Sequence, residues 1–168
     1  MVTAMVRMSK PYGYIGAVNP AYHGFASLTK KKEIAASYGA FEPENKRIIG
    51  VLHFHGTHWV AFFLDRETQI CQMFDPLQSS ATYEAIQTSV RYTMEPLLNM
   101  TDEITYEEID WCTQKDADSC GLWCLVILEL LLTKKSWNDS LYKLVPYLRL
   151  RQLYKFIECL NHVTIDDD

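Results

Sequence analysis

The sequence predicts an α+β fold in which a mixed β-sheet packs against one buried central helix, with further helices around it. Segments typical of strands are grouped between segments with helical spacing, which favours α+β over a regular α/β alternation. The segment Cys120–Leu132, CGLWCLVILELLL, is almost wholly apolar on every face, as expected for a helix enclosed by a core. The chain has 168 residues and 48% hydrophobic content, which fits one domain with one sizeable core.

The N-terminal part of the chain has the weakest pattern. Residues 1–22 are rich in Gly, Pro, Tyr and Met without a clear period, so we expect irregular or short edge structure. A short helix is predicted over Ser27–Tyr38, with Ser27 or Thr29 as its N-cap and Gly39 at its end.

Four segments are predicted strands, and two of them are joined by the short link DRETQ, which suits a hairpin. They are Arg47–Phe54, Thr57–Asp65, Gln69–Leu77 and Ile104–Trp111. In the third segment Pro76 is expected to stop the strand.

Three helices are predicted in the remainder of the chain. Apolar residues recur at helical spacing over Tyr83–Leu98. The central helix covers Cys120–Leu132, and Leu141–Leu160 holds one or two helices with a break near Pro146.

The five cysteines indicate a reducing compartment. Their number is odd and no CxxC pair occurs, so neither a disulfide framework nor zinc-finger spacing is predicted. Cys71, Cys124 and Cys159 are expected in the core.

Neither a membrane span nor a nucleic-acid partner is predicted. The longest apolar run, Leu125–Leu132, is interrupted by Glu129 and is far too short to cross a bilayer. Residues 1–10 lack the sustained apolar run of a signal peptide. The formal net charge of -5 gives no general reason to expect nucleic-acid binding.

Cys120 stands where a polar loop meets the central helix. A helix N-terminus has unpaired N–H groups and a partial positive charge, and both favour a thiolate over a thiol. Gly121 leaves space for a substrate to approach. On its own, a Cys-Gly pair is more often a small buried residue at a helix start, so partners must be found before a catalytic role is predicted.

His58, Asp75 and Gln114 are the candidate partners. His58 begins one strand of the predicted hairpin and Asp75 ends the other, so the two would be neighbours at one edge of the sheet. The imidazole could take the thiol proton, and the carboxylate could orient the imidazole. The amide of Gln114 could donate to an oxyanion together with the Cys120 backbone N–H. Asp116 and Asp118, between them, are expected to be solvated.

A metal site is the competing constellation in this region. In HFHGTH, His53 and His55 share one face of a strand with His58 beyond, and such a pair can ligate zinc. A third ligand and a second shell are not evident, so no metal is predicted.

The motifs HW at His58, an Asp at 75 and Q-x5-C-G from Gln114 to Gly121 resemble those of the ubiquitin-like-protein-specific cysteine proteases, the SUMO protease group. The adenoviral proteinase belongs to the same clan, whose His-Asp-Cys order separates it from papain, in which Cys comes first.

The resemblance implies a cysteine peptidase or isopeptidase that cleaves after the Gly-Gly tail of a ubiquitin-like protein through a thioester. His58 would be the general base and acid, Asp75 its orienting partner, Cys120 the nucleophile and Gln114 the oxyanion donor. Trp59 would cover the channel for the tail, and Ser119 and Gly121 would also contact the substrate. No cofactor is implied.

The expected partner is therefore SUMO first, then ubiquitin or a Nedd-type protein, with an activating partner left open. The acidic-aromatic segment typical of the group near its N-terminus is not found, so we expect one catalytic domain over 1–168 whose N-terminal part is truncated or divergent. The expected location is the nucleus or cytoplasm, or the host cytoplasm for a pathogen effector.

Three other functions are carried as alternatives. HWVAFFLDRETQICQMFDPLQ and SCGLWC are in places closer to viral-type proteinases, so a viral or effector protease that cuts extended peptides is the first. An acetyltransferase that uses the same triad with acetyl-CoA is the second, although no CoA or inositol-phosphate site is identifiable. A non-catalytic binding module is the third, and the presence of all four site residues argues against it.

Overall fold

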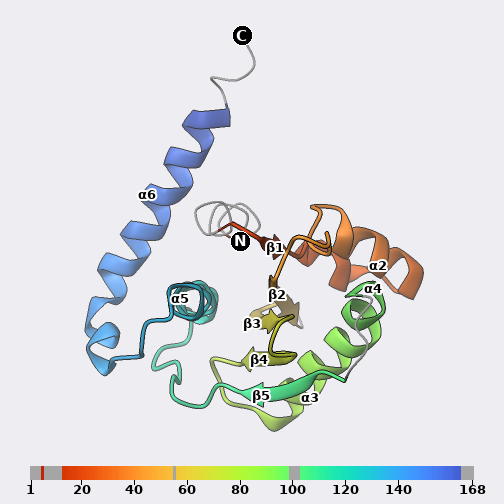
Figure 1. Ribbon diagram of the computed structural model, residues 1–168. Coiled ribbons are helices and arrows are strands. Elements are labelled where there is room, and N and C mark those ends of the chain that lie inside the picture. Colours follow the sequence, from red (N-terminus) through yellow and green to blue (C-terminus); the bar gives the residue numbers. More distant parts are fainter. Residues whose placement is uncertain (1–4, 6–12, 55, 99–102, 164–168) are drawn as a thin grey trace.

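The computed structural model describes residues 5, 13–54, 56–98 and 103–163, with side chains described as far as Glu158. At its centre is a five-stranded sheet with the order β1-β2-β3-β4-β5 (Figure 1). The strands are β1 (Ile15–Ala17), β2 (Arg47–Phe54), β3 (His58–Asp65), β4 (Ile70–Phe74) and β5 (Thr105–Glu108). The three central strands are antiparallel, whereas β1 and β5 pair in parallel with their neighbours. The predicted mixed sheet and α+β class are thus confirmed.

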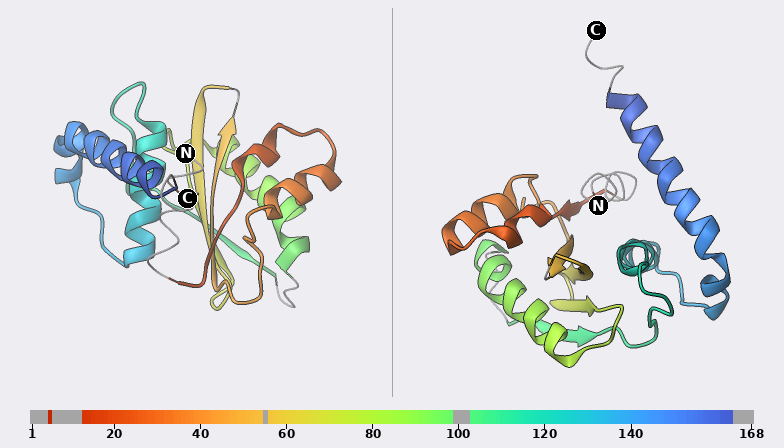
Figure 2. Two further views of the ribbon diagram at one scale, coloured as in Figure 1. Left: turned by 90° about the horizontal axis from the view of Figure 1, so that it is seen from above. Right: turned by 180° about the vertical axis from the view of Figure 1, so that it is seen from behind.

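Helices cover both faces of the sheet. The central helix α5 (Cys120–Thr133) lies on one face, and α6 (Val145–Val163) lies outside α5 (Figures 1 and 2). The other face carries α2 (Leu28–Ala36), α3 (Ser80–Ser89) and α4 (Glu95–Leu98). Short 3₁₀ helices, η2 (Pro20–Gly24) and η4 (Asp139–Leu144), precede α2 and α6.

Successive side chains along each strand point to opposite faces of the sheet, and the two faces form two separate cores. In β3, Ala61 and Phe63 pack in the cluster that includes α5. Val60, Phe62 and Leu64 point to the opposite face and join the cluster that covers the sheet on the α3 side. Because both faces are buried, a strand that reads as continuously apolar, VAFFL, is what the fold requires.

The N-terminal part contains one strand that the sequence pattern did not identify. β1 has three residues and pairs with β2 through Ile15, Gly16 and Ala17. A side chain is excluded at Gly16, because a Cβ there would lie 1.9 Å from the carbonyl oxygen of Ala40. The expected irregular or short edge structure is confirmed over residues 13–19, whereas η2 begins at Pro20, and residues 1–4 and 6–12 lie outside the described residues.

The predicted helices are present, and the one over Tyr83–Leu98 is not uniform. It starts earlier, at Ser80, and contains a π-helical turn, η3 (Val90–Met94), before α4. In that turn the N–H of Glu95 bonds the carbonyl of Val90, five residues back. Pro96 follows at once, and a proline cannot supply the N–H of a regular helical bond. The proline explains why the helix widens there.

The helix ends in the structure answer two questions that the sequence left open: which residue caps α2, and where the chain breaks near Pro146. Ser27, rather than Thr29, caps α2 by accepting a bond from the N–H of Lys30 at 3.4 Å. The predicted break near Pro146 is the change from η4 to α6, which begins at Val145.

Glu129 is the one charge in the apolar run of α5, and it ties this helix to α6. Its carboxylate accepts two bonds from Arg151, at 2.5 and 2.7 Å, and contacts Lys155 at 3.1 Å. Desolvation raises the pKa of Glu129, but the hydrogen bonds and charges of Arg151 and Lys155 outweigh it, so the pKa lies below its usual value.

The structure bears on two further predictions, the burial of three cysteines and the absence of a helix that crosses a membrane. Cys71 and Cys124 are buried as expected, whereas the side chain of Cys159 lies outside the described residues. Within the described part of the chain, none of the helices combines the length and apolar character needed to cross a bilayer.

Candidate active site

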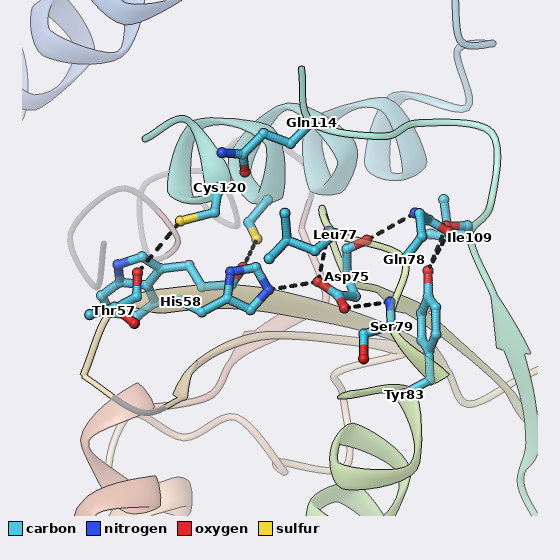
Figure 3. A network of polar contacts seen from close by, with 12 residues as sticks. Thr57, His58, Asp75, Leu77, Gln78, Ser79, Tyr83, Ile109, Gln114 and Cys120 are labelled. Atoms are coloured by element: carbon cyan, nitrogen blue, oxygen red, sulfur yellow. Dashed lines mark hydrogen bonds and ion pairs between the residues drawn. The ribbon is translucent and has the colours of Figure 1, made fainter. Parts of the chain in front are cut away.

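His58 and Asp75 meet at one end of the sheet. His58 is the first residue of β3 and Asp75 follows the last residue of β4, so the antiparallel pairing of these strands brings them together. The Nε2 atom of His58 lies 2.6 Å from Oδ1 of Asp75 (Figure 3). The neighbourhood expected from the hairpin is confirmed.

The carboxylate of Asp75 is completely buried and held by the turn that follows it. Its Oδ1 also accepts from the N–H of Leu77 at 2.9 Å, and its Oδ2 accepts from the N–H of Ser79 at 2.9 Å. An ionised carboxylate can accept all of these bonds. The imidazole therefore faces an acceptor whose position is fixed from the backbone.

Gln78 anchors this turn from the other side. Its backbone is left-handed, with φ 56°, and its Nε2 lies 2.9, 3.0 and 2.8 Å from the carbonyl oxygens of Asp75, Ile109 and Cys112, which share its two N–H groups. Its Oε1 accepts from the hydroxyl of Tyr83 at 3.0 Å (Figure 3). Burial raises the pKa of Tyr83 to about 12, so this hydroxyl remains a donor at neutral pH.

Cys120 is the first residue of α5 and is 9% exposed. Its Sγ lies 4.0 Å from the backbone oxygen of Thr57, the residue before His58 (Figure 3). The thiol is thus beside the strand end that carries the imidazole. The first backbone N–H groups of α5, at the end that carries Cys120, have no partner within the helix.

Gln114 lies in the loop before α5 and is buried to 9% exposure. Its backbone N–H donates to the carbonyl of Pro76 at 2.8 Å, which ties this loop to the turn that holds Asp75. Its side-chain Nε2 donates to the backbone oxygen of Asp116 at 2.5 Å and approaches Oδ1 of the same residue at 3.2 Å. The structure therefore gathers His58, Asp75, Cys120 and Gln114 from four separate segments.

Residues 40–158 match the model of the Ulp1 protease family, C-terminal catalytic domain. This chain belongs to the Ulp1 protease family. It is therefore a cysteine protease, as the sequence resemblance implies. A comparison with curated protein sequences gives no match.

Solved structures agree with this Ulp1-family fold at low sequence identity. The C-terminal Ulp1 protease domain in complex with SMT3, the yeast ortholog of SUMO, is 15% identical, with a TM-score of 0.76 over 96% of this chain and 75% of the other. The Xanthomonas campestris effector XopD bound to ubiquitin is 12% identical, with a TM-score of 0.59 over 80% and 74%. The central domain of the Lpg1148 protein from Legionella pneumophila is 18% identical, with a TM-score of 0.55 over 95% and 96%.

Ser119 and Gly121 flank Cys120 in this Ulp1-family protease in different ways. Gly121 is partly exposed in the first turn of α5. Ser119 is only 1% exposed, and its hydroxyl is bonded to Asp116 and Arg149. Ser119 thus holds the loop before Cys120, and a direct contact of either residue with a substrate stays a prediction.

Trp59 lies on the sheet face that carries α5. Its ring stacks on that of His53, with centroids 4.3 Å apart and planes at 24°, and its backbone oxygen lies 3.3 Å from Sγ of Cys124. The side chain is partly buried against the α5 cluster. The role of Trp59 as a cover for the substrate tail stays a prediction.

The zinc alternative gains no support. No group of three His, Cys, Asp or Glu residues that could hold a metal is present among the described residues. His55 lies outside the described residues, and His53 is stacked on Trp59.

Three other cysteines are held in the thiol form by burial. Desolvation raises the pKa of Cys112 to about 11 and also raises the pKa values of Cys71 and Cys124. Their surroundings oppose a thiolate, and Cys120 differs from them by its place at a helix N-terminus.

Two residues of this site were missed by the sequence patterns, Gln78 and Asp116. Asp116 was expected in a solvated loop, and it is indeed exposed, but its carboxylate accepts bonds from the loop that precedes Cys120. The only sequence signal was position: each lies within a few residues of a predicted site residue.

Proposed function

We propose that this Ulp1-family protease hydrolyses the peptide or isopeptide bond after the Gly-Gly tail of a ubiquitin-like protein, with SUMO as the first candidate. The observation that supports it best is the 2.6 Å contact between His58 and Asp75 beside the strand end that Cys120 approaches. In this proposal Cys120 is the nucleophile, His58 the general base and acid, and Asp75 the residue that orients the imidazole.

The reaction would proceed in two acyl-transfer steps. His58 takes the proton of Cys120, and the sulfur bonds to the carbonyl carbon of the second glycine, with the carbonyl electron pair moving to oxygen. The tetrahedral intermediate then expels the amine, which leaves with the proton from His58. Water gives a proton to the same imidazole as its oxygen attacks the thioester, and the thiolate that leaves takes this proton back.

Gln114 would stabilise the oxyanion together with the N–H of Cys120. Its amide is in the loop that leads into α5, and its backbone is fixed to Pro76. A preorganised donor of this kind contributes only when charge develops on the carbonyl oxygen.

Two considerations support a ubiquitin-like substrate. The solved relatives include a Ulp1 domain bound to SMT3 and an effector bound to ubiquitin. Trp59, next to His58 in the chain, offers a flat indole that could restrict the channel to residues without a side chain. The free cysteines are compatible with a reducing, intracellular location, which we include in the proposal.

Activity-based probes test the proposal directly. SUMO, ubiquitin and Nedd-type proteins that carry a C-terminal Gly-Gly propargyl group should be offered separately, with adduct formation measured by intact mass. We expect one adduct, with SUMO fastest, which Cys120→Ala abolishes and the control Cys71→Ala retains. An adduct that survives Cys120→Ala would refute the assignment.

The requirement for glycine separates the two kinds of protease. We expect the parent to cleave fusions ending in Gly-Gly far faster than those ending in Ala-Gly, and Trp59→Ala to lose this preference. Equal cleavage of both by the parent would favour an enzyme that cuts extended peptides. If only an added cellular partner restores cleavage, the partner is an activator.

The oxyanion role of Gln114 has its own measurement. Gln114→Ala should lower kcat by roughly 10²–10³ and change KM little, because the amide would act on the transition state. An unchanged kcat would leave Gln114 as a structural residue of the loop.

A further inference from the structure

The side-chain amide of Gln114 is held in one orientation by Asp116. Its Nε2 lies 2.5 Å from the backbone oxygen of Asp116 and 3.2 Å from its Oδ1. A primary amide has two N–H donors. A single N–H shared between these two oxygens of Asp116, in a three-centre bond, would anchor the side chain and leave the second N–H for another acceptor.

The opposite orientation of this amide is disfavoured. Exchanging Nε2 and Oε1 would place the amide oxygen against two oxygens of Asp116, which repel it. Asp116 thus determines that Nε2 of the Gln114 amide, and not Oε1, faces its oxygens. In the observed orientation Oε1 of Gln114 is buried without a hydrogen-bond partner among the described atoms, which is a cost that only a compensating contact or function would maintain.

Asp116 is itself fixed by the loop that leads to the nucleophile. Its Oδ1 accepts from the N–H of Ser119 at 2.9 Å and of Asp118 at 3.2 Å, and its Oδ2 accepts from the hydroxyl of Ser119 at 2.5 Å. Desolvation raises the pKa of this carboxyl, but the bonds from Ser119 and Asp118 lower it below its usual value. The carboxylate is therefore charged at neutral pH.

The loop is also attached to the outer helix. Arg149 of α6 donates to the Ser119 hydroxyl and to Oδ1 of Asp118, both at 2.8 Å. Asp118 is largely exposed, so its ion pair with Arg149 contributes little. Asp116 is the member of this group that contacts Gln114.

We propose that Asp116 is a positioning residue for the oxyanion donor: it orients the Gln114 amide so that one N–H is free for the developing oxyanion beside Cys120. The inference rests on the proposed function, since it gives Gln114 its role. Asp116 acts through Gln114 and through the loop, without touching the substrate.

The first test compares three variants by kcat and KM on a Gly-Gly substrate. Asp116→Ala removes the Oδ1 contact of Gln114 and the bonds that fix the loop, and keeps the contact to the backbone oxygen. It should lower kcat about tenfold with little change in KM, a smaller effect than loss of Gln114 itself. Asp116→Asn keeps an acceptor oxygen at Oδ1 and should retain activity within about twofold. Asp118→Ala removes an equal charge two residues away and serves as the control, with kcat unchanged.

A double-mutant cycle separates orientation of Gln114 from general damage to the loop. In a Gln114→Ala background, Asp116→Ala should lower kcat by less than about twofold, because the group that it orients is already absent. Equal effects in both backgrounds, or an unchanged kcat for Asp116→Ala alone, would overturn the inference.

Failure of this inference can be distinguished from failure of the proposed function. If Cys120→Ala abolishes probe labelling while Asp116→Ala is indistinguishable from the parent, the proposed function stands and only the positioning role is wrong. Thermal unfolding of each variant, with a Tm close to that of the parent, ensures that folded protein is compared.

Discussion

Gln78 should be one of the largest contributors to stability among the polar residues of this chain. Gln78→Ala removes three donor contacts to backbone carbonyls and one acceptor contact from a hydroxyl. The carbonyl of Ile109 keeps its bond from Tyr83 at 2.9 Å, whereas the carbonyl of Cys112, a fully buried residue, loses the contact described above.

The expected loss of stability depends on which of these polar groups is left without a hydrogen-bond partner after the substitution. A net hydrogen bond contributes about 1 kcal/mol, and a buried acceptor left without a partner costs about 1–3 kcal/mol. Gln78 is only half-buried, so water replaces part of the loss. We expect Gln78→Ala to lower the free energy of unfolding by about 2–4 kcal/mol. For a domain of this size the Tm should fall by about 5–15 °C.

The backbone at this position provides an internal check. Gln78 has φ 56° and Gln69, in the turn between β3 and β4, has φ 58°. A left-handed non-glycine residue costs about 1–2 kcal/mol, which glycine avoids. The Gly variant should therefore be about 1 kcal/mol more stable than the Ala variant at both positions.

Urea unfolding at constant m-value gives the free energy of unfolding of the parent and of the four variants, with Ala or Gly at Gln78 and at Gln69. A Gln78→Ala variant within about 0.5 kcal/mol of the parent would refute the reasoning, because surface changes are usually of that size. A Gly–Ala difference present at Gln69 and absent at Gln78 would refute the backbone part alone.

Three further outcomes are expected. Iodoacetamide at near-neutral pH should label Cys120 before Cys112 and the other buried cysteines, as peptide mapping over time would detect; faster labelling of Cys112, whose pKa burial raises to about 11, would contradict this. Glu129→Gln should lower the free energy of unfolding by about 1–2 kcal/mol at pH 7. Because the folded pKa of Glu129 is lowered, its stabilisation is present above the usual value of 4.5 and is lost as pH falls through the folded pKa, so urea titrations should show the deficit closing in acid. Gly16→Ala should cost about 3 kcal/mol by the same assay, whereas Gly24→Ala, where a Cβ has open space, should be near neutral.

The fold was largely predictable because its main elements have a clear period or composition. The strands at Arg47–Phe54 and His58–Asp65, and the helix that starts at Cys120, were predicted within a few residues of their observed bounds. The adjacency of His58 and Asp75 followed from one inference, that two successive strands form a hairpin. These features depend on local sequence and on the nearest neighbour in the sheet.

The residues that support the site, such as Gln78 and Arg149, were not predictable because their contacts join segments that are far apart in the sequence. Gln78 bonds the carbonyl of Cys112, 34 residues away, and Arg149 reaches Ser119, 30 residues away. Both contacts join loops whose course has no periodic signal. The π-helical turn before Pro96 was missed because the apolar spacing continues through it. The burial of the Ser119 hydroxyl depends on α6, whose position against α5 no pattern specifies.

The sequence distances within the site have a consequence for how the chain folds. His58 and Asp75 are 17 residues apart, whereas Cys120 and Thr57 are 63 apart. Closing the longer loop costs about 1 kcal/mol more in chain entropy, and it also requires α5 to dock on a sheet that already exists. The histidine and its carboxylate can thus be assembled by a local hairpin, while the thiol arrives with later, long-range contacts. A newly made or partly unfolded chain would then hold the paired His58 and Asp75 without the thiol of Cys120, so the complete group of side chains would form only when the fold is complete.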